Sequence, residues 1–313
     1  MNMVVSHWSA NPVVLAALVA VAATHLLGMS ASFAEARHLA RPLPAGAVAQ
    51  AIMFYAGLCV VLVALVSPVG YWSGEFIWVR SLQDVLLAVV APGLIVLGAP
   101  WLVLARGAAC VRTARIAPGQ TGRLGMPHPS AGGDRDQSPA PLEWSWLAWP
   151  VVVTVAFNAA WLGWHLPGPY DTAARYPVAD AAEIVTYLGF GIAFWLQLIG
   201  SRPFAPRFAP MLRFVLVAAT VAATSALAMV LIFDTGRLYH GLGGASHRVL
   251  SVVSDQQVGG SVLFAVALPP LVVVAVALCI RWLAADESEG VTVELDRMLN
   301  SRTSAWPSRP GFR

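Results

Sequence analysis

Long apolar runs separated by short polar segments are the main pattern in this chain of 313 residues. Seven runs hold about 18–24 mostly apolar residues, the length that a helix needs to cross a hydrocarbon core about 30 Å thick. They cover approximately residues 12–33, 46–67, 81–105, 144–164, 180–199, 211–233 and 256–282. Because backbone groups in a bilayer must be satisfied internally, the pattern predicts an all-α membrane protein, a seven-transmembrane helix bundle.

The composition supports this prediction and argues against a soluble protein. Hydrophobic residues make up 58% of the chain and charged residues 11%. An ordinary soluble domain has about 45–50% apolar and about 25% charged residues. So few charges suffice for the loops of a membrane protein, but they do not cover the surface of a 33.1 kDa globule.

The distribution of arginine predicts the orientation in the membrane. Fifteen of the 19 basic residues follow the first, third and fifth runs or lie in the tail, and four lie in the alternate segments. Since cytoplasmic loops carry the excess of basic residues, the N-terminus is expected outside and the C-terminus inside. That parity requires an odd number of spans, which agrees with seven.

Two polar segments are expected to lie on the cytoplasmic side. Residues 106–143 are rich in Gly, Pro, Ser and Arg, which is typical of a flexible loop. Residues 284–313 form a polar tail that we expect to be disordered, and residues 1–283 form the transmembrane domain. Among the helix-breaking residues, Pro92, Pro100 and the pair Pro269-Pro270 should kink or break the third and seventh helices.

Other functional classes have little support in the sequence. The net charge of +3 comes from scattered arginines and not from a dense basic face, so no nucleic-acid partner is expected. Cys59, Cys110 and Cys279 have neither disulfide-framework nor zinc-site spacing. Phosphate-binding glycine loops, HExxH and GxSxG arrangements do not occur in a suitable setting, so an enzyme is not predicted.

Polar residues gather where several predicted helices meet the outer face of the membrane. This outer-face polar cluster contains Arg80, Gln83, Asp84, Asp171, Asp180 and Gln256, with His165, Glu183 and Asp255 at the same depth. Ionisable groups at such depths are costly and therefore candidates for a functional site. Structural roles are the alternative: Arg80 and Asp84 have the spacing of an ion pair along one helix, Asp255 could cap a helix, and His165 could donate a hydrogen bond.

Five segments between Phe54 and Trp282 form an ordered set: FYAGLCVVLVALVSPVGYW, LQDVLLAVVAPGLIVLGAPWLVLA, WHLPGPYDTA, YLGFGIAFW and SDQQVGG. In this order they resemble the CtaG family, membrane proteins that assist assembly of caa-type cytochrome c oxidase in bacteria. The resemblance implies a multi-pass protein of the bacterial inner membrane that contacts cytochrome c oxidase subunits and the lipid bilayer. It also implies copper as a candidate cofactor.

The chain departs from the family where that family commonly carries histidine pairs. The pair that opens the third helix is replaced by Arg80 and Asp84, and the pair in the fifth helix by Asp180 and Ile184. Because a guanidinium cannot ligate copper and repels it, we expect poor copper binding at the usual place. His165, Glu183 and Asp255 could still form a weaker metal site.

These observations predict an integral membrane assembly factor for cytochrome c oxidase, with copper delivery at the outer face as one way of assisting. A copper or small-solute transporter with a pathway along the kinked helices is one alternative. A purely structural membrane bundle, in which the outer polar groups serve as caps and ion pairs, is the other.

Overall fold

The computed structural model describes residue 8 and residues 11–40, 46–116, 149–204, 206, 208–242 and 250–284. In this part of the chain every regular element is a helix, which confirms the predicted fold class. The elements are α1 (Pro12–His38), α2 (Ala47–Val66), α3 (Pro68–Trp72), α4 (Ile77–Val85), η1 (Leu86–Val90), α5 (Ala91–Leu97), α6 (Trp101–Ile116), α7 (Trp149–Trp164), α8 (Pro167–Arg175), α9 (Pro177–Leu198), α10 (Pro210–Phe233), α11 (Val252–Val262) and η2 (Leu263–Ala267). The last helix continues from α11 through η2 to Ala284.

Six helices of the described residues are long and apolar enough to cross a membrane. They are Pro12–His38, Ala47–Val66, Ile77–Leu97, Pro177–Leu198, Pro210–Phe233 and Val252–Ala284. α7 is also apolar, but its 16 residues are shorter than these six helices. The protein is therefore a multi-pass membrane protein, while the seventh crossing and the orientation of the termini stay predictions.

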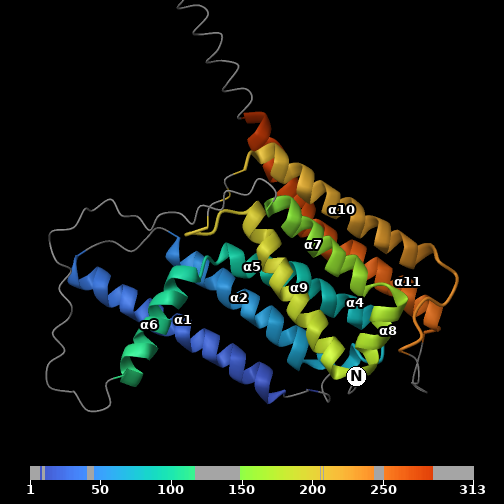
Figure 1. The fold of residues 1–313 in the computed structure, drawn as a ribbon, viewed down its shortest axis with the longest axis horizontal. Helices are drawn as coiled ribbons and strands as arrows, with labels where there is room; N and C mark the ends of the chain where they lie inside the picture. The colour runs from blue at the N-terminus through green and yellow to red at the C-terminus, as the bar shows by residue number, and fades with distance from the viewer. Residues whose placement is uncertain are drawn as a thin grey trace, which may run out of the picture.

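The helix made of α4, η1 and α5 is the centre of the bundle (Figure 1). Of the 18 most apolar consecutive residues of this helix, 78% are buried. In the other five helices that are long enough to cross a membrane, the corresponding share is 11–33%. This central helix packs against α2, α9 and α11, while α7 packs against α9 and α10. Side chains on the central helix therefore contact protein on nearly all sides, and a polar group placed there must find its partners within the chain.

The predicted third span, residues 81–105, proves to be parts of two helices. The chain leaves the helical path after Leu97, and Ala99 has a left-handed φ of 42° just before Pro100. α6 then starts in a new direction and runs to Ile116 (Figure 1). The predicted flexible loop over residues 106–143 is therefore wrong for residues 106–116, which are helical. Its remainder lies outside the described residues, as does the predicted tail apart from residue 284.

α6 crosses α1 at a point where both helices carry glycine. A Cβ atom on Gly28 would lie 1.9 Å from the carbonyl oxygen of Val103, and one on Gly107 would lie 1.9 Å from that of Thr24. Beside this crossing, Arg106 forms an ion pair of 3.3 Å with Glu35. The N-terminal helix is therefore held through backbone contact with α6 and is otherwise largely exposed.

The central helix and the last helix each have a π-helical turn just before their prolines. η1 immediately precedes the turn that contains Pro92, and η2 precedes Pro269 and Pro270. Proline has no backbone N–H, and its ring clashes with the carbonyl one turn earlier. A π-turn widens the helix at that point, so each helix continues past its prolines instead of ending there.

Close packing at η1 depends on a glycine of α9. A Cβ atom on Gly191 would lie 2.5 Å from the carbonyl oxygen of Ala88 and 2.8 Å from Cγ of Pro92. Gly189, two residues earlier on α9, has no such neighbour within 4 Å. The same helix thus supplies a crowded glycine and an open one.

We expect Gly191→Ala to lower the free energy of unfolding by about 1–3 kcal/mol because a methyl group must push apart α9 and the central helix. Gly189→Ala should instead raise the free energy of unfolding by up to about 1 kcal/mol, because alanine has a higher helix propensity than glycine and its methyl group meets no neighbour here. Unfolding of both purified variants in one detergent, followed by loss of helical signal, measures the difference. Equal shifts for the two variants would contradict the packing at η1.

Candidate functional site

Most of the predicted polar residues meet at one end of the bundle, here called the polar end, where α4, α9 and α11 begin and α7 ends (Figure 1). Five of them form what we call the ionic cluster: Arg80, Asp84, His165, Asp180 and Glu183. All except Asp180 are buried, with relative exposures of 2–4%. The side chain of Asp180 is 40% exposed, so the cluster reaches the surface through this residue.

Arg80 is the only one of these five side chains that carries a permanent positive charge. Its Nη2 donates to a carboxylate oxygen of Glu183 and, at 3.4 Å, to Oδ1 of Asp180. Its guanidinium carbon also lies 5.3 Å from the ring centroid of Tyr170, a cation–π arrangement. The predicted pair with Asp84 along the same helix is therefore wrong, because Arg80 pairs across the bundle with α9.

His165 faces Asp84 from the turn between α7 and α8. Its Nδ1 lies 2.8 Å from the carbonyl oxygen of Trp161, which can only accept, so Nδ1 carries the proton. Burial and, to a smaller extent, the positive charge of Arg80 lower the pKa of His165 to about 4. The imidazole is therefore neutral at pH 7, and Nε2, 3.7 Å from Oδ2 of Asp84, is a lone-pair acceptor without a hydrogen-bond partner among the described residues.

Four aromatic side chains enclose the cluster. They are Trp161, Tyr170, Tyr187 and Tyr239, and each is at most 1% exposed. The rings of Tyr170 and Tyr239 stack with centroids 3.8 Å apart, and the Tyr239 hydroxyl donates to the backbone oxygen of His165 at 2.9 Å. Burial raises the pKa of Tyr239, so the phenol stays a donor. These rings exclude water and thereby strengthen every charge interaction they surround.

The other predicted site residues bind backbone groups. Asp255 accepts hydrogen bonds from the amides of Ile77 and Trp78 at 3.0 and 3.1 Å and so caps α4, a different helix from its own. Gln83 donates to the Ala64 carbonyl at 2.9 Å. Gln256 accepts from Leu238 N–H at 3.1 Å.

Asp171 also binds backbone amides, in this case those of the segment that follows α10. It accepts from His240 N–H and Gly241 N–H at 2.9 and 2.7 Å. Gln83, Asp171, Asp255 and Gln256 thus hold the polar end together from its periphery. Asp255 does cap a helix, as predicted, but the helix is α4, which lies on a distant part of the chain.

The residues present do not fit a copper ion. Among the described residues, no three His, Cys, Asp or Glu side chains are arranged to hold a metal. Of the predicted set His165, Glu183 and Asp255, the last is engaged by two backbone amides and Glu183 is bound to Arg80. The guanidinium stands among the carboxyl groups, and it repels cations and has no lone pair to offer.

Sequence reasoning missed part of the site. Trp161, Tyr187 and Tyr239 lie in apolar or unremarkable contexts, and their roles depend on helices that meet only in the folded protein. His25 and the glycine pair of α11 behave as ordinary packing residues: His25 stacks on Phe54, and Cβ atoms on Gly259 and Gly260 would approach α4 and α10 to within 3 Å.

The fold and the site together define a polytopic helical membrane protein with a buried ionic cluster at one end, in which a guanidinium lies among carboxyl groups. The family model for cytochrome c oxidase caa3 assembly factors (Caa3_CtaG) matches residues 31–285. The chain belongs to this family, as the resemblance of its five segments implies. No curated protein and no solved structure matches it.

We expect Arg80→Ala to destabilise the protein by about 3–5 kcal/mol because it leaves buried carboxyl groups without their cation. Free guanidinium at low millimolar concentration, far below denaturing levels, should restore part of the loss by entering the vacated space. Thermal unfolding of the purified variant, with and without the salt, measures this. Arg175→Ala, at an exposed site, is the control, with urea as the matched additive.

Two results would contradict this account of the cluster. One is an Arg80→Ala variant as stable as the parent. The other is an equal response of both variants to guanidinium, which would mean that the salt acts on the protein generally and not at the cluster.

Proposed function

We propose that this protein is an assembly factor for cytochrome c oxidase that acts through protein contacts and does not carry copper in its ionic cluster. The family match supports the oxidase as client. The arginine distribution supports placing the polar end on the outer face of a bacterial inner membrane, with the C-terminus inside. The role is non-catalytic, and lipid and the client are its partners.

The position of Arg80 is the observation that carries this proposal. Its guanidinium occupies the space between Asp180 and Glu183, where an exogenous cation would otherwise be held. A cation supplied by the chain is always present and cannot be passed on. The cluster is then a permanent connection between the central helix and α9, and it fixes the surface that α8 and the α9 N-terminus present at the polar end.

Copper delivery at the outer face is the second candidate. The bare Nε2 of His165 favours it, because a neutral imidazole nitrogen without a partner is a good ligand for copper. On this hypothesis Asp84, 3.7 Å away, would be the accompanying ligand.

A transport pathway has less support. Among the described residues, the buried charged side chains other than Arg213 gather at the polar end. Arg213 lies at the start of α10 and donates to the Leu198 carbonyl at the end of α9. The polar groups buried between these ends are mainly threonines such as Thr220 and Thr224, which form no chain of ionisable groups for a cation.

A deletion strain tests the proposed function. Membranes that lack the protein should lose cytochrome oxidase activity and the corresponding haem signal in reduced-minus-oxidised spectra, and added copper should not restore them. A plasmid copy of the gene is the control and should restore both. Restoration by copper would favour delivery of the metal instead, and full activity without the gene would contradict a required assembly role.

Anaerobic titration of the purified protein with Cu(I) tests the cluster directly. We expect no tight stoichiometric binding, because Arg80 repels the ion and leaves it too few ligands. Stoichiometric binding that disappears in both His165→Ala and Asp84→Ala, with helical content unchanged, would overturn this expectation.

A further inference from the structure

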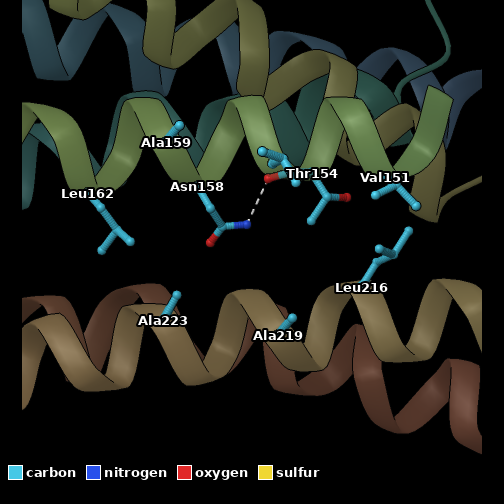
Figure 2. Close-up of a pocket in the computed structure, with 9 residues that line it drawn as sticks. Val151, Thr154, Asn158, Ala159, Leu162, Leu216, Ala219 and Ala223 are labelled. Carbon is cyan, nitrogen blue, oxygen red and sulfur yellow. Dashed lines mark hydrogen bonds between the residues drawn. The ribbon is translucent and has the colours of Figure 1, made fainter. Parts of the chain in front are cut away.

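A groove between α7 and α10 lies apart from the ionic cluster and shares no residue with it. Its volume is about 410 Å³, and its walls come from these two helices alone (Figure 2). Val155 and Leu162, which line it, are 61% and 37% exposed, so the groove opens on the outer surface of the bundle. Both helices are apolar along their length, and we expect this surface to face the hydrocarbon core if α7 crosses the membrane as predicted.

The groove is lined by two polar side chains whose hydrogen bonds the described residues do not complete. Asn158 donates from Nδ2 to the Thr154 carbonyl at 2.8 Å and to Oγ1 of Thr220 at 2.9 Å, so both of its N–H groups are used. In the part of the chain that the structure describes, neither Oδ1 of Asn158 nor Oγ1 of Thr154 has a hydrogen-bond partner, and both atoms are buried. Figure 2 shows the Asn158 amide pointing from α7 into the space towards α10.

Unpartnered oxygens at this depth constrain what can occupy the groove. A buried polar group without a hydrogen bond costs free energy, and hydrocarbon has no donor to supply. A lipid acyl chain would therefore fill the volume but leave both oxygens unsatisfied. A helix with a hydroxyl or amide side chain would fill the volume and donate as well, which is how polar residues join helices in membranes.

The shape of the groove also favours a helix. Ala159 on α7 and Ala219 and Ala223 on α10 line it, and small residues let a third backbone approach closely. Two copies of a concave groove facing each other would leave a void between them, so a second copy of this chain is a poor occupant. A convex partner is required.

We propose that this groove, defined by Thr154, Asn158, Ala159, Leu162, Ala219 and Ala223, docks one transmembrane helix of a client oxidase subunit. The identity of that client rests on the proposed function. The docked helix carries a serine, threonine or amide side chain at mid-membrane depth, which donates to Asn158 or Thr154. Oδ1 of Asn158 and Oγ1 of Thr154 are buried in the free protein. Docking therefore includes rotamer changes of these two side chains, which are common at interfaces.

Photo-crosslinking in native membranes tests the proposal. A benzophenone amino acid is placed at Leu162 or Val155 in the groove, and at Val152 and Val230, which are exposed outside it, as controls. We expect the groove positions to crosslink a membrane-spanning peptide of an oxidase subunit, identified by mass spectrometry, and the control positions to give lipid or nothing.

A substitution that fills the groove provides a second test of the docking proposal. Ala223→Phe should abolish that crosslink and lower oxidase activity in the complemented deletion strain. The purified variant should unfold at the same temperature as the parent or higher, because the ring fills open space. Ala277→Phe, at an exposed alanine of the last helix, should leave both crosslink and activity unchanged.

The outcomes separate the groove from the oxidase assignment. Crosslinks only to lipid, only to another copy of this chain, or equally at groove and control positions would overturn the docking proposal even if the deletion strain lacks oxidase. A groove-specific crosslink to a helix of some other membrane protein, in a strain with normal oxidase, would overturn the client and the proposed function while keeping the groove as a helix-binding site.

Discussion

The buried pairing of Arg80 with Glu183 is the interaction on which the rest of the polar end depends. A guanidinium removed from water is tolerated only with a close counter-charge and hydrogen bonds, and here α9 supplies both. The requirement brings α9 against the central helix and turns the cation towards the ring of Tyr170 on α8. Four separate segments, α4, α8, α9 and the turn that carries His165, are thereby placed within a few ångströms of one another.

The prolines impose a second constraint, which acts on the backbone and not on charge. A straight helix through Pro92 would lose a hydrogen bond and meet the carbonyl of Ala88. The π-turn resolves the clash, and Gly191 lets α9 pack against the widened segment. Together the ion pair and this close packing join α9 to the central helix at two points along its length.

Much of this architecture follows from residue patterns that act locally. Helix length and apolar composition depend on neighbouring residues, which is why six of the predicted apolar runs correspond to helices long enough to cross a membrane. The gathering of Arg80, Asp84, His165, Asp180 and Glu183 is also predicted, because each lies near the start or end of an apolar run. Run length alone, however, does not distinguish one span of residues 81–105 from a helix that ends at Leu97 and a second helix that starts after Pro100.

Partners within the site depend on rotations that no linear pattern contains. Arg80 and Asp84 have ideal spacing for a pair on one helix, yet the folded chain turns Arg80 to α9 and Asp84 to His165. Asp255 likewise caps α4 across 178 residues of sequence. Such choices are made by burial: a charged side chain in the interior binds the partner that satisfies it most completely, wherever that partner lies in the chain.

The same reasoning connects the cluster to the groove on the other side of α7. In the cluster the chain meets the need of a buried cation with its own carboxylates, and the site is closed to an outside ligand. In the groove, Asn158 donates both of its N–H groups to residues of the chain, whereas its Oδ1 accepts no hydrogen bond from the described residues. A protein that assists another's assembly needs such an incomplete surface, because a group already satisfied gains nothing from a partner. The two sites therefore have different roles: one holds the bundle in shape, and the other is left to be completed from outside.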